Sequence, residues 1–136
     1  MQEALRGVKP PVSIHVATDG EEALRYLRRQ GEFKSFPRPN LIFLDFNLPK
    51  ASSRDVLREI KGDEDLRVIP VAVFTTSEAE RDIRNAYELY ANCYLRKPLD
   101  LDSFFETIVL AAQFWLDVAY TPTGAKEEAF ERPHLL

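Results

Sequence analysis

The sequence predicts a single α/β domain built on a parallel, doubly wound sheet, and three observations support this fold class. Short β-branched or aliphatic runs alternate with longer segments in which apolar residues recur every three to four positions. The runs at residues 41–44 and 71–74 are apolar without alternation, as expected for strands that helices cover on both faces. The length of 136 residues suits one hydrophobic core rather than two.

Four short segments rich in β-branched and aliphatic side chains predict the strands, because such side chains pack well on a pleated surface. These strands are predicted at residues 12–17, 40–45, 69–75 and 93–96. Turn-forming residues separate them from their neighbours and limit their length. The turn-forming residues are Asp19-Gly20, Pro37, Pro39, Pro49 and Pro98.

The segments between the strands predict helices, since their apolar residues share one face. These helices are predicted at residues 21–29, 54–61, 78–90 and 101–120. Asp100, or the capping-box spacing of Ser103 and Glu106, begins the last of them. From Thr121 onward the apolar periodicity disappears, so we expect one domain over residues 1–120 and a C-terminal tail over residues 121–136.

Composition and charge exclude several classes of protein. Lys and Arg number 18 against 22 Asp and Glu, a net charge of −4, and no basic run has the density that binds nucleic acid. The most apolar stretch, residues 108–120, is interrupted by Gln113 and Asp117 and is too short to span a membrane. The single Cys cannot form an internal disulfide, and residues 1–12 lack the apolar core of a signal peptide. We therefore expect a cytoplasmic protein that binds neither nucleic acid nor membrane.

Three side chains that suit phosphoryl chemistry stand where predicted strands end. Asp45, Thr75 and Lys97 each follow an apolar strand, and the carboxyl ends of parallel strands meet at one edge of a doubly wound sheet. A carboxylate oxygen can attack a phosphoryl group there to form an acyl phosphate, while a hydroxyl and an ammonium stabilise the transferred oxygens. The sequence therefore predicts a phosphoryl-accepting site.

Several linked segments resemble the receiver domains of bacterial two-component response regulators. They are residues 38–50 (RPNLIFLDFNLPK), Thr75-Thr76-Ser77, residues 91–95 (ANCYL), Lys97-Pro98 and Phe114-Trp115-Leu116. They are similar to one branch in particular, the small stand-alone regulators paired with bacterial phytochrome-type histidine kinases. The resemblance implies a flavodoxin-like (CheY-like) fold and a phosphorelay module that signals through protein contacts and is not an enzyme.

The resemblance also implies a role for each matching residue. Asp45 accepts phosphate from a kinase histidine and binds Mg²⁺ together with the backbone carbonyl of Asn47. Lys97 contacts the phosphoryl group, and Thr75 moves to bond it. Tyr94, three residues before the lysine, turns inward in response. The charge change at the aspartate thereby biases a two-state surface around the last strand and helix.

The family pattern begins with a strand that ends in two acidic Mg²⁺ ligands, and we find neither here, since residues 1–5 resemble the end of the following helix. We therefore expect a weak Mg²⁺ site. The sheet order second, first, third, fourth, fifth would leave an empty central slot. Three explanations are open: the recorded start lies downstream of the real one, the second strand pairs elsewhere, or another chain fills the gap. We favour the first. A smaller departure is Ser53, where the family usually has Gly.

The last predicted helix is apolar around most of its circumference, because Gln113 and Asp117 share one narrow stripe. A single sheet cannot cover so wide a surface. Leu110, Phe114 and Val118 form a ridge beside that stripe at positions i, i+4 and i+8. Either the tail folds back over this ridge or, as we favour, the ridge is the subunit interface of a homodimer.

Two further functions are compatible with the same residues. A degenerate receiver would bind partners without phosphorylation if its metal site were incomplete. An aspartate-nucleophile phosphatase usually carries a second Asp two residues after the nucleophile as general acid. That position here is Asn47, which cannot donate a proton in this way, so the phosphatase ranks third.

Overall fold

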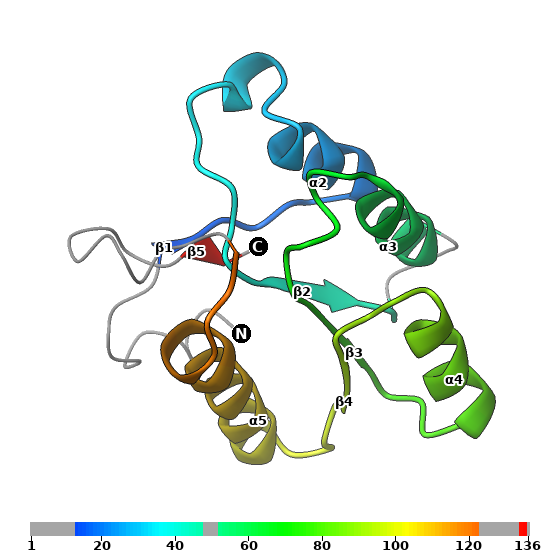
Figure 1. Ribbon diagram of the computed structural model, residues 1–136. Helices are drawn as coiled ribbons and strands as arrows, with labels where there is room; N and C mark the ends of the chain where they lie inside the picture. The colour runs from blue at the N-terminus through cyan, green and yellow to red at the C-terminus, as the bar shows by residue number, and fades with distance from the viewer. Residues whose placement is uncertain (1–12, 48–51, 123–133, 136) are drawn as a thin grey trace.

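The computed structural model describes residues 13–47, 52–122 and 134–135 (Figure 1). The helix end expected at residues 1–5 lies outside the described residues. The elements, among them a 3₁₀ helix η1 and a π-helical turn η2, follow one another in chain order. They are β1 (Ser13–Ile14), α2 (Gly20–Leu27), η1 (Gly31–Phe33), β2 (Ile42–Asp45), α3 (Ser52–Gly62), β3 (Val71–Thr75), α4 (Glu80–Glu88), β4 (Cys93–Arg96), α5 (Leu101–Gln113), η2 (Phe114–Val118) and β5 (His134–Leu135).

Strands β2, β3 and β4 form a parallel sheet in that order. Asp45 pairs with Phe74, and Thr75 pairs with Arg96, so the carboxyl ends of all three strands meet at one edge. Every residue of the central strand β3 is buried, as expected for a strand covered on both faces. The parallel α/β class predicted from the sequence is confirmed.

Helices cover the two faces of this sheet unequally. Figure 1 shows α2, α3 and α4 on one side of the strands and α5 on the other. Leu27, Leu57 and Ala86 from the first three helices are buried in one cluster with Val73 of β3. Ile108 of α5 belongs to a second cluster on the opposite face. None of the described helices is both long and apolar enough to cross a membrane.

Strand β1 pairs in parallel with β5, Ser13 opposite His134 and Ile14 opposite Leu135, and forms a separate two-stranded sheet. The sequence predicts no element beyond Thr121, and this short strand corrects that expectation. Two residues are too few to carry a periodicity from which a strand could be inferred. The pairing agrees with the explanation in which the strand predicted at residues 12–17 pairs elsewhere, although the observed strand is shorter than the predicted one.

The segment predicted as one helix over residues 101–120 changes geometry partway. It is α-helical as far as Gln113 and then widens into the π turn η2, where the Ala119 N–H donates to the Phe114 carbonyl at 2.7 Å. Asp100 caps the helix as predicted, because its carboxylate accepts the Ser103 N–H at 2.9 Å. That hydrogen bond lowers the pKa of Asp100.

Helix α4 begins at Glu80, two residues later than predicted. The Ser77 hydroxyl donates to Asp82 Oδ2 at 2.6 Å and accepts the Ala79 N–H at 3.2 Å. These bonds fold the preceding residues into a turn rather than into the first helical turn. The β3–α4 loop is therefore longer than the sequence pattern suggests, and it lies beside the carboxyl edge of the sheet.

Candidate functional site

Asp45 and Lys97 lie in contact at the carboxyl edge of the sheet. Asp45 is the last residue of β2, Lys97 follows directly after β4, and the Lys97 ammonium donates to Asp45 Oδ1 at 2.8 Å. The two side chains are 25% and 20% exposed, respectively. A pair at this depth is screened less than a pair on the open surface. The structure thus brings together two predicted site residues that are far apart in the sequence.

The two carboxylate oxygens of Asp45 differ in their surroundings. Oδ1 accepts the Lys97 ammonium and also the N–H of Asn47, each at 2.8 Å. No hydrogen bond to Oδ2 occurs within the described parts of the chain. The hydrogen bonds to Oδ1 fix the orientation of the carboxylate, and a carboxylate oxygen can act as a nucleophile or as a ligand for a cation.

Ser53 holds the backbone of the same strand end. Its side chain is buried, and its hydroxyl donates to the carbonyl oxygen of Asp45 at 2.8 Å. The bond satisfies a backbone acceptor at the rim of the site. Sequence reasoning missed this contact, because a serine near a helix start is usually explained by capping and gives no sign of a carbonyl eight residues earlier.

Thr75 lies on the neighbouring strand, but its hydroxyl is engaged elsewhere. The residue is 4% exposed, and Oγ1 accepts the N–H of Ser77 at 3.2 Å. The Thr75 carbonyl accepts the backbone N–H of Lys97 at 2.7 Å. The structure therefore joins the backbone of Thr75 to Lys97 and turns its hydroxyl into the β3–α4 loop.

Asn47 and Thr76 link the loops that follow β2 and β3. Asn47 Oδ1 accepts the Thr76 N–H at 2.8 Å, and Asn47 Nδ2 donates to Thr76 Oγ1 at 3.1 Å. Sequence reasoning assigned a role only to the backbone carbonyl of Asn47 and none to Thr76. The side-chain link was not predictable, since it joins residues that are 29 positions apart.

Ser77 connects the predicted switch residues Thr75 and Tyr94. Its N–H donates to the Thr75 hydroxyl, and its carbonyl accepts the Tyr94 hydroxyl at 2.9 Å. Tyr94 lies on β4 and is partly buried against the core beneath α2, α3 and α4. The structure thus bonds Tyr94 to the β3–α4 loop and joins it to Thr75 through Ser77.

Asp45 and Asn47 provide two oxygen atoms suited to a hard cation. Mg²⁺ prefers oxygen ligands and usually keeps several waters and substrate phosphate oxygens, so a carboxylate and a carbonyl fit a partly hydrated ion. Within the described ranges, no group of three or more His, Cys, Asp or Glu side chains is arranged to hold a metal. The Asp45 carboxylate and the Asn47 carbonyl therefore fit Mg²⁺ as two of its oxygen ligands, and the weak binding expected from the sequence stays a prediction.

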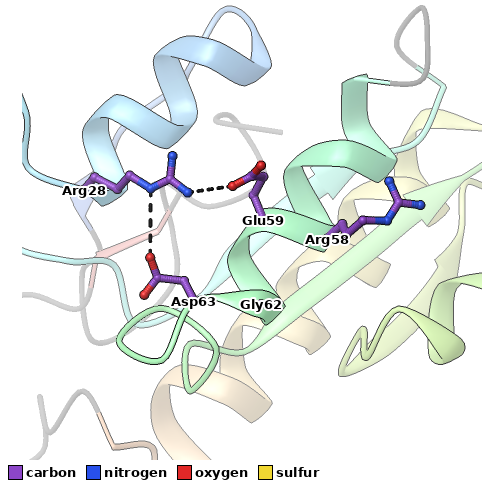
Figure 2. Close-up of a pocket in the computed structure, with 5 residues that line it drawn as sticks. All are labelled: Arg28, Arg58, Glu59, Gly62 and Asp63. Atoms are coloured by element: carbon purple, nitrogen blue, oxygen red, sulfur yellow. Dashed lines mark hydrogen bonds and ion pairs between the residues drawn. The ribbon is translucent and has the colours of Figure 1, made fainter.

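A hollow of about 280 Å³ lies between the end of α2 and α3, away from this site (Figure 2). Figure 2 shows Arg28 between two carboxylates. Its guanidinium nitrogens are 2.7 Å from Glu59 Oε2 and 4.0 Å from Asp63 Oδ2. The opposite charges neutralise one another in a solvent-exposed setting, where such pairs contribute little. The hollow contains none of the residues that the sequence singled out.

The ridge predicted on the last helix is exposed. Leu110 on α5 is 67% exposed, and Phe114 and Val118 on η2 are 50% and 63% exposed. Monomeric proteins seldom expose several large apolar side chains side by side. Because its three side chains are exposed, the ridge lies on a face of the last helix that the sheet does not cover. It is separate from the strand edge that carries Asp45.

Taken together, the strand edge carries a carboxylate, an ammonium in contact with it and, on the adjacent strand, the buried Thr75. This arrangement can receive a phosphoryl group and stabilise its negative charge.

Comparison with known proteins agrees with this chemistry. The family model of the response regulator receiver domain matches residues 1–109. Response regulator Rcp1 of Synechocystis sp. is 43% identical over 124 residues, which cover 91% of this chain and 84% of the relative. The crystal structure of the phosphorylated cyanobacterial phytochrome response regulator RcpA is 45% identical, with a TM-score of 0.83 over 89% of this chain and 86% of that chain. The Mn²⁺-bound form of Rcp1 is 44% identical, with a TM-score of 0.81 over 89% and 87% of the two chains.

The match extends over most of the sequence and includes the strand edge just described. In this family a kinase phosphorylates an aspartate of the receiver, and RcpA is a cyanobacterial phytochrome response regulator. This chain belongs to the response regulator receiver domain family.

Proposed function

We propose that this receiver accepts a phosphoryl group on Asp45 from a histidine kinase and transmits the signal through protein contacts. The observation that carries the proposal is the 2.8 Å contact between the Lys97 ammonium and Asp45 Oδ1. It places a cation beside a carboxylate at the edge where β2 and β3 end. The buried Thr75 supplies a hydroxyl on the adjacent strand.

The transfer conserves atoms and charge in a simple displacement. A carboxylate oxygen of Asp45 attacks the phosphorus of a phosphohistidine, a P–O bond forms and the P–N bond breaks. The electron pair of that bond stays on the imidazole nitrogen, and the ring, which carries a proton on its other nitrogen, leaves as neutral imidazole. Lys97 stabilises the charge on the transferred oxygens. Hydrolysis by water then returns the carboxylate and releases inorganic phosphate, so the chain catalyses only its own modification and recovery.

Mg²⁺ would be held by the Asp45 carboxylate and the Asn47 carbonyl, and when bound it neutralises part of the phosphoryl charge. The Mn²⁺-bound form of Rcp1 supports a divalent cation in this family. The Asn47 N–H and the Lys97 ammonium orient the carboxylate through their hydrogen bonds to Asp45 Oδ1. The protein groups therefore hold the acceptor in place whether or not the cation is present.

The switch follows from the hydrogen bonds of Ser77. If the Thr75 hydroxyl leaves Ser77 to bond a phosphoryl oxygen, the Ser77 N–H loses its acceptor. Ser77 also holds Tyr94 through its carbonyl and Asp82 of α4 through its hydroxyl. A change at Asp45 can therefore reach the face formed by α4, β4 and α5, where partner proteins would detect it.

A phytochrome-type histidine kinase is the partner that the relatives favour. RcpA is a cyanobacterial phytochrome response regulator, and it shares 45% identity with this chain. Purified phytochrome-type kinase, loaded with phosphate on its histidine, should transfer the label to this chain faster than an unrelated histidine kinase does. Equal transfer from both kinases would contradict this assignment of the partner.

Incubation with acetyl phosphate and Mg²⁺ tests the acceptor directly. Intact-mass analysis should show the gain of one phosphoryl group, and the gain should be absent in Asp45→Asn. Asp55→Asn is the matched control, because Asp55 lies exposed on α3, where it pairs with Arg58. A chain that gains no phosphoryl group would instead be a receiver that binds its partners without phosphorylation.

We also propose that Leu110, Phe114 and Val118 form a homodimer interface. The three side chains are at least half exposed and lie on the α5–η2 segment, which suits a self-complementary apolar patch. Light scattering at micromolar concentration should show a dimer that Phe114→Glu converts to a monomer. Tyr87→Glu, at an exposed position on α4, should leave the dimer intact. A monomeric wild type would refute the interface.

A further inference from the structure

The peptide group between Thr75 and Thr76 is held from both sides by the residues that hold Asp45. Its carbonyl accepts the Lys97 N–H at 2.7 Å, and its N–H donates to Asn47 Oδ1 at 2.8 Å. The Lys97 ammonium and the Asn47 N–H also donate to Asp45 Oδ1. The acceptor carboxylate and the backbone of Thr75 are thus connected by two separate residues, which form a closed ring of hydrogen bonds.

We infer that the Asn47 side chain and Thr76 are a positioning pair that fixes Thr75 at a set distance from Asp45 for phosphoryl transfer. This inference rests on the proposed function of Asp45. With its following peptide pinned, the backbone of Thr75 does not have to move when the phosphoryl group arrives. Rotation of the Thr75 side chain alone exchanges the Ser77 N–H for a phosphoryl oxygen. The ordering of this group is completed before the reaction begins, which lowers the barrier to transfer.

The surroundings of the pair favour a positioning role over a stabilising one. Asn47 and Thr76 are both exposed, so their two hydrogen bonds compete with water and contribute little to global stability. Their effect is instead local, because Thr76 is adjacent to Thr75 and Asn47 is two residues from Asp45. Loss of the pair should therefore change the rate of phosphorylation more than the stability of the fold.

Four variants separate these two roles. Asn47→Ala removes both side-chain bonds but keeps the backbone N–H that holds Asp45 and the carbonyl proposed for Mg²⁺. Thr76→Val removes only the hydroxyl bond at nearly constant shape, and Thr76→Ser restores that hydroxyl. Asn85→Ala, at an exposed position on α4, is the matched control for loss of an asparagine side chain.

The assay follows phosphoryl uptake from acetyl phosphate with Mg²⁺ by intact mass, alongside urea unfolding. We expect uptake to slow about tenfold in Asn47→Ala, as the loss of two modest hydrogen bonds from a preorganised transition state predicts. Thr76→Val should slow it about threefold by losing one bond, and Thr76→Ser should restore most of the rate. Asn85→Ala should take up phosphate at the rate of the wild type, and the urea midpoints of the Asn47 and Thr76 variants should agree with that of the wild type.

Each outcome decides the inference. If the wild type is phosphorylated and Asn47→Ala takes up phosphate at the same rate, the positioning pair is refuted while the proposed function stands. A slower uptake accompanied by a clear fall in the urea midpoint of the same variant would also refute the inference, because the pair would then stabilise the fold. A wild type that takes up no phosphoryl group refutes the proposed function and this inference together.

Discussion

A double-mutant cycle of Asp45→Asn and Lys97→Met measures the coupling between the two charged groups of the site. The groups are 2.8 Å apart, and their side chains are 25% and 20% exposed. Exposed ion pairs couple by about 0.2–1 kcal/mol. Breaking a buried pair costs about 3–5 kcal/mol. At the intermediate depth of this pair, we expect a coupling free energy of about 1–3 kcal/mol.

The losses in free energy of unfolding of the two single variants should add up to more than the loss of the double variant. Lys97→Met leaves the Asp45 carboxylate with the Asn47 N–H but without a cation, and Asp45→Asn leaves a partly buried ammonium without its anion. The double variant contains neither charge, so it avoids both penalties. The effects of the two substitutions should therefore not add.

Urea unfolding of the four proteins at neutral pH, followed by circular dichroism, provides the required free energies of unfolding. High salt should reduce the coupling only modestly, because the pair is partly shielded from solvent. A coupling below about 0.3 kcal/mol would lie within ordinary additivity. That result would mean that the pair does not form in solution, and it would refute the reasoning that gathers Asp45 and Lys97 into one site.

Three further predictions concern stability. Ile108→Ala, in the fully buried α5 face, should lower the free energy of unfolding in urea by about 2–5 kcal/mol, and a loss under about 1 kcal/mol would contradict that packing. Ser53→Ala leaves the Asp45 carbonyl without its donor and should cost about 1–3 kcal/mol in the same assay, whereas no loss would show that water replaces the hydroxyl. Burial lowers the pKa of Lys61 from 10.5 to about 8. Between these two pH values the unfolded chain binds more protons at Lys61, so wild-type stability should rise with pH relative to Lys61→Met, and parallel pH profiles would contradict this.

The lysine at position 61 illustrates how far sequence patterns reach. Its place near the end of the predicted helix at residues 54–61 suggests an exposed charge. In the structure its ammonium donates to the carbonyls of Arg67 and Ile69 and to Asn92 Oδ1, at 2.9–3.0 Å. Those acceptors come from two separate loops. No local period identifies them, because a helical pattern specifies which face a residue occupies but not which loop meets that face.

The interior strands were predictable for the opposite reason. The runs at residues 41–44 and 71–74 are apolar at every position, as is typical of strands covered on both faces. The clusters around Val73 on one face and Ile108 on the other have this arrangement. The strand at residues 134–135 has no such signal, and its pairing with Ser13 and Ile14 depends on which segments meet in space.

The amino-acid sequence alone determined the parallel α/β class and the placing of Asp45, Thr75 and Lys97 at one strand edge, because both depend on the order and periodicity of short segments. Only the tertiary structure decided how those residues are held. The links of Asn47 to Thr76 and of Ser77 to both Thr75 and Tyr94 depend on the positions of loops in the packed molecule. Hydrogen bonds require a donor–acceptor distance that is set to within a few tenths of an ångström, and local patterns along a chain do not encode distances so finely.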